Sequence, residues 1–237
     1  MNNTRYSILE KELHDRIKWF IFLRWIAIIG LFLVITISYF ILKVDLHIIP
    51  LYLGNAFLLF YNSLFYLNYK KRISKWLNKS NTSANIQISI DLIMLTYLIY
   101  FSGNIENPFI FFYIFHMVIA SILLSNRAAY LQATLAIILL GGVLLFVYLK
   151  IIPHHHLLGS IPEELYTSNY PYYLIKFSVF IITLYITVYM STTIVNKLRE
   201  RENDTPVIMY SAFGDSHLGV ESARLGVFDF LPKGDDL

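Results

Sequence analysis

Six long apolar runs constrain this chain more than any other feature of its sequence. An α-helix needs about 20 apolar residues to cross the hydrocarbon core of a bilayer, and each run approaches that length. The runs occupy residues 24 to 42, 46 to 68, 86 to 103, 108 to 125, 128 to 149 and 172 to 195. Backbone groups inside a bilayer must find their hydrogen bonds within the protein, so such runs fold as spanning helices. The sequence therefore predicts an all-α integral membrane protein, a six-helix transmembrane bundle.

The composition supports this prediction and excludes several classes of function. Hydrophobic residues make up 57% of the 237 residues and charged residues 15%, whereas soluble domains carry roughly 25% charged residues. Without Cys, the sequence offers no disulfide, thiolate metal site or cysteine nucleophile. The formal net charge of +3 is too small to indicate nucleic-acid binding. We expect the lipid bilayer to be the main partner.

Lys and Arg residues are concentrated at one end of the predicted spans. They precede or open the first span, fill the loop at residues 70 to 79, and follow the sixth span, with Arg127 between the fourth and fifth spans. The opposite span ends carry only Lys43, Lys150 and Lys176. Because basic loops remain in the cytoplasm, we predict a multi-pass protein of the cell inner (plasma) membrane with both termini cytoplasmic.

Residues 1 to 23 form a largely polar cytoplasmic segment before the first span. Apolar residues recur at helical spacing between residues 5 and 20, which predicts an amphipathic helix on the membrane surface. We expect Arg24, with Trp19 and Trp25, at the membrane interface, where aromatic rings and long cationic side chains are stable.

A polar turn at residues 102 to 109 interrupts the chain at membrane depth. Asn107 is expected to cap the following helix, and Pro108 to take its first position, where the missing N–H is not needed. Glu106 lies within this short connection, and His116 lies two turns into the next helix. Because ionisable residues within spans are costly, the turn is a candidate functional site; a simple loop between two spans is the alternative.

The run Gly103-Asn104-Ile105-Glu106-Asn107-Pro108-Phe109 resembles a known signature. The signature is Gly-Gly-x-x-Asn-Pro-Phe, from the membrane domain of redox-responsive, quinone-sensing bacterial sensor histidine kinases. Asn104 departs from its second Gly. The resemblance extends to Arg24-Trp25-Ile26-Ala27 and to the helix at residues 111 to 124. It implies that residues 24 to 196 form a six-span membrane sensor domain that binds a quinone or similar lipophilic ligand near the fourth span.

The implied ligand site comprises Gly103, Glu106, Asn107, Pro108, Phe109, Phe112, Tyr113 and His116. A flat quinone head group needs apolar walls and one or two hydrogen-bond donors. Phe109, Phe112 and Tyr113 are expected to form the walls, and the Asn107 amide and a ring N–H of His116 to donate. We expect Asn107 and Phe109 to dominate binding.

Other interpretations remain open for the ionisable residues. His116 is equally well explained by a hydrogen bond to a neighbouring helix. For Glu106, a solvated loop carboxylate is a simpler explanation than a role in proton uptake on quinone reduction. Asp91 and Lys176 lie within spans, and each is either an interface residue or a buried partner.

No metal site is predicted. His154, His155 and His156 are adjacent in the one sizeable outer loop, where consecutive side chains point in different directions. A second cluster at metal-ligand spacing is lacking, so we interpret these residues as interfacial loop histidines.

A short tail follows the junction at residues 197 to 204. Residues 205 to 211 and 227 to 231 have buried-strand patterns around a helix-like segment, and residues 205 to 237 resemble the last third of a response-regulator receiver domain. The resemblance implies a short, incomplete α/β unit. Ser211 and Lys233 match family positions that contact a phosphoryl group on an Asp, but that Asp has no counterpart. We therefore expect Ser211 and Lys233 to be exposed polar residues and the tail to be loosely held.

The predicted function is that of a sensory input module in a two-component (phosphorelay) system. The sequence has no recognisable phospho-accepting His box or nucleotide-binding motif, so we expect no enzyme activity. One alternative is a non-catalytic remnant that forms a homodimer or a heterodimer with an intact sensor kinase. The other is a small membrane transporter, which would call for charged residues facing each other across several spans or an internal repeat.

Overall fold

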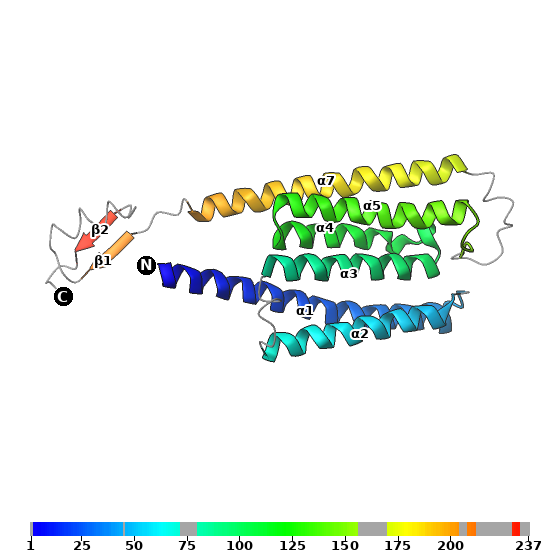
Figure 1. Ribbon diagram of the computed structural model, residues 1–237, viewed down its shortest axis with the longest axis horizontal. Coiled ribbons are helices and arrows are strands. Elements are labelled where there is room, and N and C mark those ends of the chain that lie inside the picture. Colours follow the sequence, from blue (N-terminus) through cyan, green and yellow to red (C-terminus); the bar gives the residue numbers. More distant parts are fainter. Residues whose placement is uncertain are drawn as a thin grey trace. The chain divides into compact units, whose positions relative to one another are not determined.

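The computed structural model describes residues 2–44, 46–71, 80–155, 170–203, 208–211 and 229–232. The chain divides into two units, Met1–Thr192 and Thr193–Leu237. The helical elements are α1 (Asn2–Phe40), α2 (Ile48–Lys71), α3 (Ser80–Phe101), η1 (Asn104–Glu106), η2 (Pro108–Phe111), α4 (Phe112–Leu123), α5 (Asn126–Tyr148) and α7 (Tyr170–Asn203). All except the last part of α7 belong to the first unit (Figure 1).

The membrane part is an all-α bundle, as the sequence predicts. Five of its described stretches are long and apolar enough to cross a membrane: Lys18–Phe40, Ile48–Leu67, Thr82–Phe101, Asn126–Tyr148 and Pro171–Leu198. The fourth predicted span corresponds to a shorter apolar stretch, Pro108–Leu123. It is short because the chain leaves the helix after Leu123, and the Ser125 hydroxyl then caps α5.

α1 is one continuous helix of 39 residues from Asn2 to Phe40. The helix predicted at residues 5 to 20 is therefore present, and it continues without a break into the first span. No Gly or Pro lies between this segment and the first span, so the sequence contains no residue that would break the helix there.

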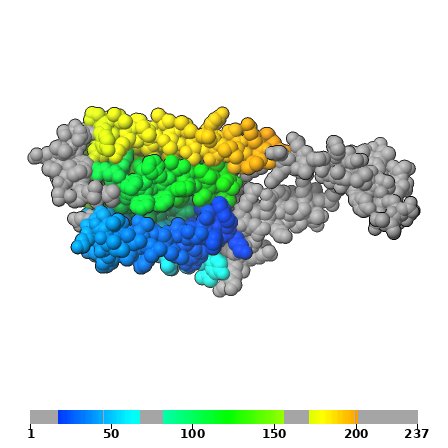
Figure 2. Space-filling model, turned by 180° about the vertical axis from the view of Figure 1, so that it is seen from behind, coloured from blue at the N-terminus to red at the C-terminus, as the bar shows by residue number. Residues whose placement is uncertain are grey.

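The bundle is layered around α3 (Figure 1). α1 pairs with α2, α2 contacts α3, and α3 packs against both α4 and α5. The main apolar core lies among α3, α4, α5 and α7, and includes Leu92, Met117 and Leu184. A smaller core of Ile35, Leu51 and Leu98 joins α1 and α2 to α3. Figure 2 shows α1 and α7 at opposite edges of the bundle, with the segment that contains α4 and α5 between them.

Large aromatic side chains of α7 fill the space between this helix and its neighbours. The Phe180 ring meets the Tyr113 ring edge-on, with centroids 5.2 Å apart, and the hydroxyl groups of Tyr185 and Thr134 share a 3.0 Å hydrogen bond. Phe177 lies over Gly141, where an added Cβ would come within 2.7 Å of the ring. A glycine is therefore needed at this point of the α5–α7 contact.

The second unit contains two short strands, β1 (Ile208–Ser211) and β2 (Asp229–Pro232). They pair in parallel, with Ile208 opposite Asp229 and Ser211 opposite Pro232. Both strands overlap the predicted strand segments. The predicted helix-like segment and Lys233 lie outside the described residues, and the resemblance to a receiver domain remains a prediction.

Two adjacent glycines of α5 provide a test of the α5–α7 contact. Leu at position 141 would collide with Phe177, whereas nothing lies within 4 Å of a Cβ at position 142. We expect Gly141→Leu to destabilise the protein by about 1–3 kcal/mol through overpacking. Gly142→Leu should leave stability unchanged or raise it, because Leu favours a helix more than Gly does. Thermal unfolding in detergent measures both, and equal midpoints for the two variants would contradict the packing described above.

Candidate functional site

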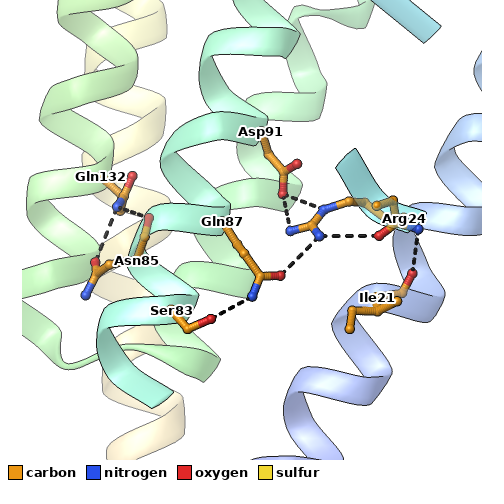
Figure 3. Close-up of polar contacts among 8 residues, drawn as sticks. Ile21, Arg24, Ser83, Asn85, Gln87, Asp91 and Gln132 are labelled. Carbon is orange, nitrogen blue, oxygen red and sulfur yellow. Dashed lines mark hydrogen bonds and ion pairs between the residues drawn. The ribbon is translucent and has the colours of Figure 1, made fainter. Parts of the chain in front are cut away.

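Arg24 lies inside the bundle, so the prediction that it sits at the membrane interface is wrong. Its side chain is buried, and its Nε and Nη2 atoms donate to Oδ2 of Asp91 on α3 at 3.0 and 2.8 Å (Figure 3). Ile21, Arg24 and Ile28 are buried at helical spacing, which places Arg24 on the inward face of α1. Asp91, for which the sequence left two alternatives, is thus a buried partner.

Polar side chains complete the environment of this ion pair. Nη1 of Arg24 donates to Gln87 Oε1 at 3.1 Å and to Asn62 Oδ1 at 3.4 Å, and Gln87 Nε2 donates to Ser83 Oγ at 3.0 Å. Ser83, Gln87 and Asp91 are four residues apart on one face of α3 (Figure 3). We call Arg24, Asn62, Ser83, Gln87 and Asp91 the Arg24 cluster. Asn62, Ser83 and Gln87 were missed from the sequence; the four-residue spacing of polar residues along α3 was the available signal for a buried polar face, although not for its partner.

Aromatic rings cover the Arg24 guanidinium. Its Cζ lies 4.2 Å from the ring centroid of Phe20, 5.0 Å from that of Tyr61 and 5.8 Å from that of Phe65. Such contacts are favourable for a cation removed from water. Within the described residues, Oδ1 of Asp91 and the Tyr61 hydroxyl are buried without a hydrogen-bond partner.

A second polar group joins α3 to α5. Gln132 Nε2 donates to Ser89 Oγ at 3.0 Å and to the backbone carbonyl of Asn85 at 3.2 Å. Asn85 and Gln132 lie on the side of α3 away from Arg24 (Figure 3). α3 therefore makes buried polar contacts on two faces, to α1 and α2 on one and to α5 on the other.

The polar turn has the predicted backbone arrangement. Gly103 has a φ of 108°, in the region that favours glycine, and Pro108 is the first residue of η2. Asn107 Oδ1 accepts from the backbone N–H of Phe109 at 2.8 Å, which is the predicted cap. Asn107 Nδ2 also donates to the carbonyl and the hydroxyl of Ser102. The Asn107 amide thus closes the turn, and donating to a ligand would compete with these bonds.

The expected apolar walls do not line one site. Phe109 and Phe112 are exposed on the surface of the bundle and stack with ring centroids 5.3 Å apart at 18°. Tyr113 is fully buried instead, and its hydroxyl shares a 2.7 Å hydrogen bond with Thr96 of α3. Of the three expected wall residues, only Phe109 and Phe112 lie together on the surface.

The hydrogen bond that the structure gives His116 lies within α4, and its expected role in ligand binding remains a prediction. Its Nδ1 donates to the Phe112 carbonyl of its own helix at 2.8 Å, and the side chain is half-buried.

Glu106 is not a solvated loop carboxylate. Its Oε1 accepts from the Tyr173 hydroxyl at 2.9 Å and lies 3.7 Å from His154 Nε2, with only 18% of the side chain exposed. The turn is therefore joined to the start of α7 and to the segment after α5. Lys176, half-buried, has its Nζ 4.4 Å from the Tyr172 ring centroid.

The described histidines after α5 lie apart from any metal-binding group. His155 contacts the rings of His47 and Tyr100, with centroids 4.3 and 4.8 Å away. No group of three or more potential metal ligands occurs among the described residues, and His156 lies outside them.

Substitution of Asn107 tests its role in closing the turn. Asn107→Ala removes both the cap and the bonds to Ser102, and we expect it to destabilise the protein by about 1–3 kcal/mol. Asn107→Asp keeps an oxygen that can accept from the Phe109 N–H, so it should lower the stability of the protein less than Asn107→Ala does. Thermal unfolding in detergent should give the highest midpoint for wild type, a lower one for Asn107→Asp and the lowest for Asn107→Ala. An unchanged midpoint for Asn107→Ala would show that the amide does not hold the turn.

Comparison with models of known protein families identifies the family to which this bundle belongs. The model of the PilS-like transmembrane domain matches residues 8–205, which covers the helical bundle except for the first six residues of α1. No curated protein and no solved structure gives a match. The matched family consists of multi-span membrane domains associated with sensor kinases of two-component systems. The chain belongs to the PilS-like transmembrane domain family.

Proposed function

We propose that this membrane sensory module responds to a quinone or a similar flat, lipophilic molecule that enters from the bilayer. The observation that carries the proposal is the stacked pair of Phe109 and Phe112, exposed at the polar turn. Exposed aromatic faces next to hydrogen-bonding groups suit a planar ring with polar edges. Glu106, held by Tyr173 near His154, supplies ionisable groups close to the same turn.

A physical route leads from this turn to α7. Glu106 accepts a hydrogen bond from Tyr173 at the start of α7, and Tyr113 of α4 packs against Phe180, about two turns further along that helix. A ligand that shifts η2 or α4 would therefore alter contacts of α7, which continues to Asn203. We propose that both termini are cytoplasmic and that α7 carries the response to that side.

The transporter alternative receives partial support from Arg24 and Asp91, which face each other across two spans. A transport site must open to a substrate, however, and this pair is buried and covered by aromatic rings. Within the described residues it is the one ion pair between an Arg or Lys and an acidic side chain. We therefore favour a sensory role for the bundle.

The proposal assigns no phosphoryl transfer to this chain. A signal from the bundle would reach a kinase through a homodimer or through a heterodimer with an intact sensor kinase. The receiver-like tail has no assigned part in this route. That Ser211 and Lys233 are exposed polar residues remains a prediction.

Quinone binding tests the proposal. We expect Phe109→Ala and Phe112→Ala each to weaken retention of a short-chain ubiquinone analogue by about 1–2 kcal/mol, because each removes one apolar face. Phe60→Ala is the matched control, since Phe60 is an exposed aromatic residue on α2. Purified protein would be titrated with the analogue by equilibrium dialysis in detergent. Equal affinities for all four proteins would show that the binding surface lies elsewhere. A wild-type protein that does not bind the analogue would contradict the proposal that the ligand is a quinone.

A further inference from the structure

Asn104 differs from the other polar residues of the turn, Ser102, Glu106 and Asn107, in having a side chain without hydrogen bonds. The residue is only 1% exposed, and neither Nδ2 nor Oδ1 has a partner. Its neighbour in the turn, Asn107, is equally buried but has its amide engaged through both atoms. A buried amide without partners lowers stability, because it gives up its hydrogen bonds to water.

Asn104 is close in the fold to the exposed aromatic pair. Its carbonyl accepts from the backbone N–H of Asn107 at 3.1 Å, and Asn107 in turn caps the segment that begins with Pro108 and Phe109. The backbone here consists of two short 3₁₀ segments, η1 and η2, whose hydrogen bonds are weaker than those of an α-helix. The turn would have to open for the buried Asn104 amide to meet a ring bound against Phe109, and we take this opening as part of the inference below.

The amide has a specific chemical preference. It offers donors on Nδ2 and an acceptor on Oδ1, so both are satisfied only by a group that accepts and donates. A hydroquinone hydroxyl does both. A quinone carbonyl only accepts, and it would leave Oδ1 of Asn104 buried and unpaired.

We infer that Asn104 makes this site selective for the reduced hydroquinone over the oxidised quinone. The inference rests on the function proposed above and adds to it the redox form that is bound. It concerns binding alone, with no electron transfer to or from the protein. Asn104, rather than the already engaged Asn107, is then the residue that recognises the polar edge of the ligand.

The test is competitive binding of the two redox forms. Detergent-solubilised protein would be incubated without oxygen in an equal mixture of decylubiquinone and decylubiquinol, washed, and extracted for chromatography. We expect wild type to retain the hydroquinone about five-fold or more over the quinone, the factor that corresponds to one unpaired buried oxygen. Asn104→Gly should abolish this preference. Gly also accepts the backbone of this position, where φ is 54°.

Two further variants separate recognition from stability. Asn104→Asp keeps an oxygen that accepts from a hydroxyl, so it should retain or increase the preference for the hydroquinone. Asn55→Ala is the matched control, because Asn55 also has a buried oxygen without a partner and lies on α2, outside the turn segment. It should leave the preference unchanged.

The outcomes distinguish the inference from the proposed function. If wild type and Asn104→Gly retain both forms equally, the site binds the ring but Asn104 does not select its redox state. A loss of preference in Asn104→Asp as large as that in Asn104→Gly would also overturn the inference. If wild type retains neither form, the proposed function itself is wrong.

Discussion

The ion pair of Arg24 and Asp91 is the interaction on which the arrangement of this bundle depends. Opposite charges buried in an apolar environment are held together strongly, because separating them there leaves each without water or counter-charge. Lipid gives little driving force for apolar helices to associate, so polar contacts of this kind decide which helices meet. Here the pair, with Gln87 and Asn62, fixes α1 and α2 against one face of α3.

α3 thereby becomes the central element of the sensory module. Its opposite side binds α5 through Gln132, and its last turns bind α4 through Thr96 and Tyr113. The polar turn follows directly after α3, and Glu106 in that turn connects to α7. Under the proposed function, a ligand at the turn would act beside a helix whose position the buried ion pair holds, and α4 and α7 would be the elements that respond.

The sequence predicts the helical bundle and the backbone of the turn because hydropathy, Pro and Gly act locally. It does not predict partners between helices, since these depend on how each helix is rotated. Arg24 was expected at the interface for this reason, although polar residues spaced by four in α3 pointed to a buried polar face. Likewise, Tyr113 was grouped with Phe109 by proximity in sequence, and only the rotation of α4 separates them. The engaged amide of Asn107 and the unpaired amide of Asn104 are equally invisible to sequence patterns.

A double-mutant cycle on the ion pair tests its central role most directly. Unfolding free energies would be measured in mixed micelles for wild type, Arg24→Leu, Asp91→Leu and the double variant, with the exposed Arg127→Leu as control. Each single change leaves one buried charge unpaired and should cost about 3–5 kcal/mol, whereas the double variant should be more stable than either. If the two losses simply add in the double variant, the ion pair does not hold α1 to α3.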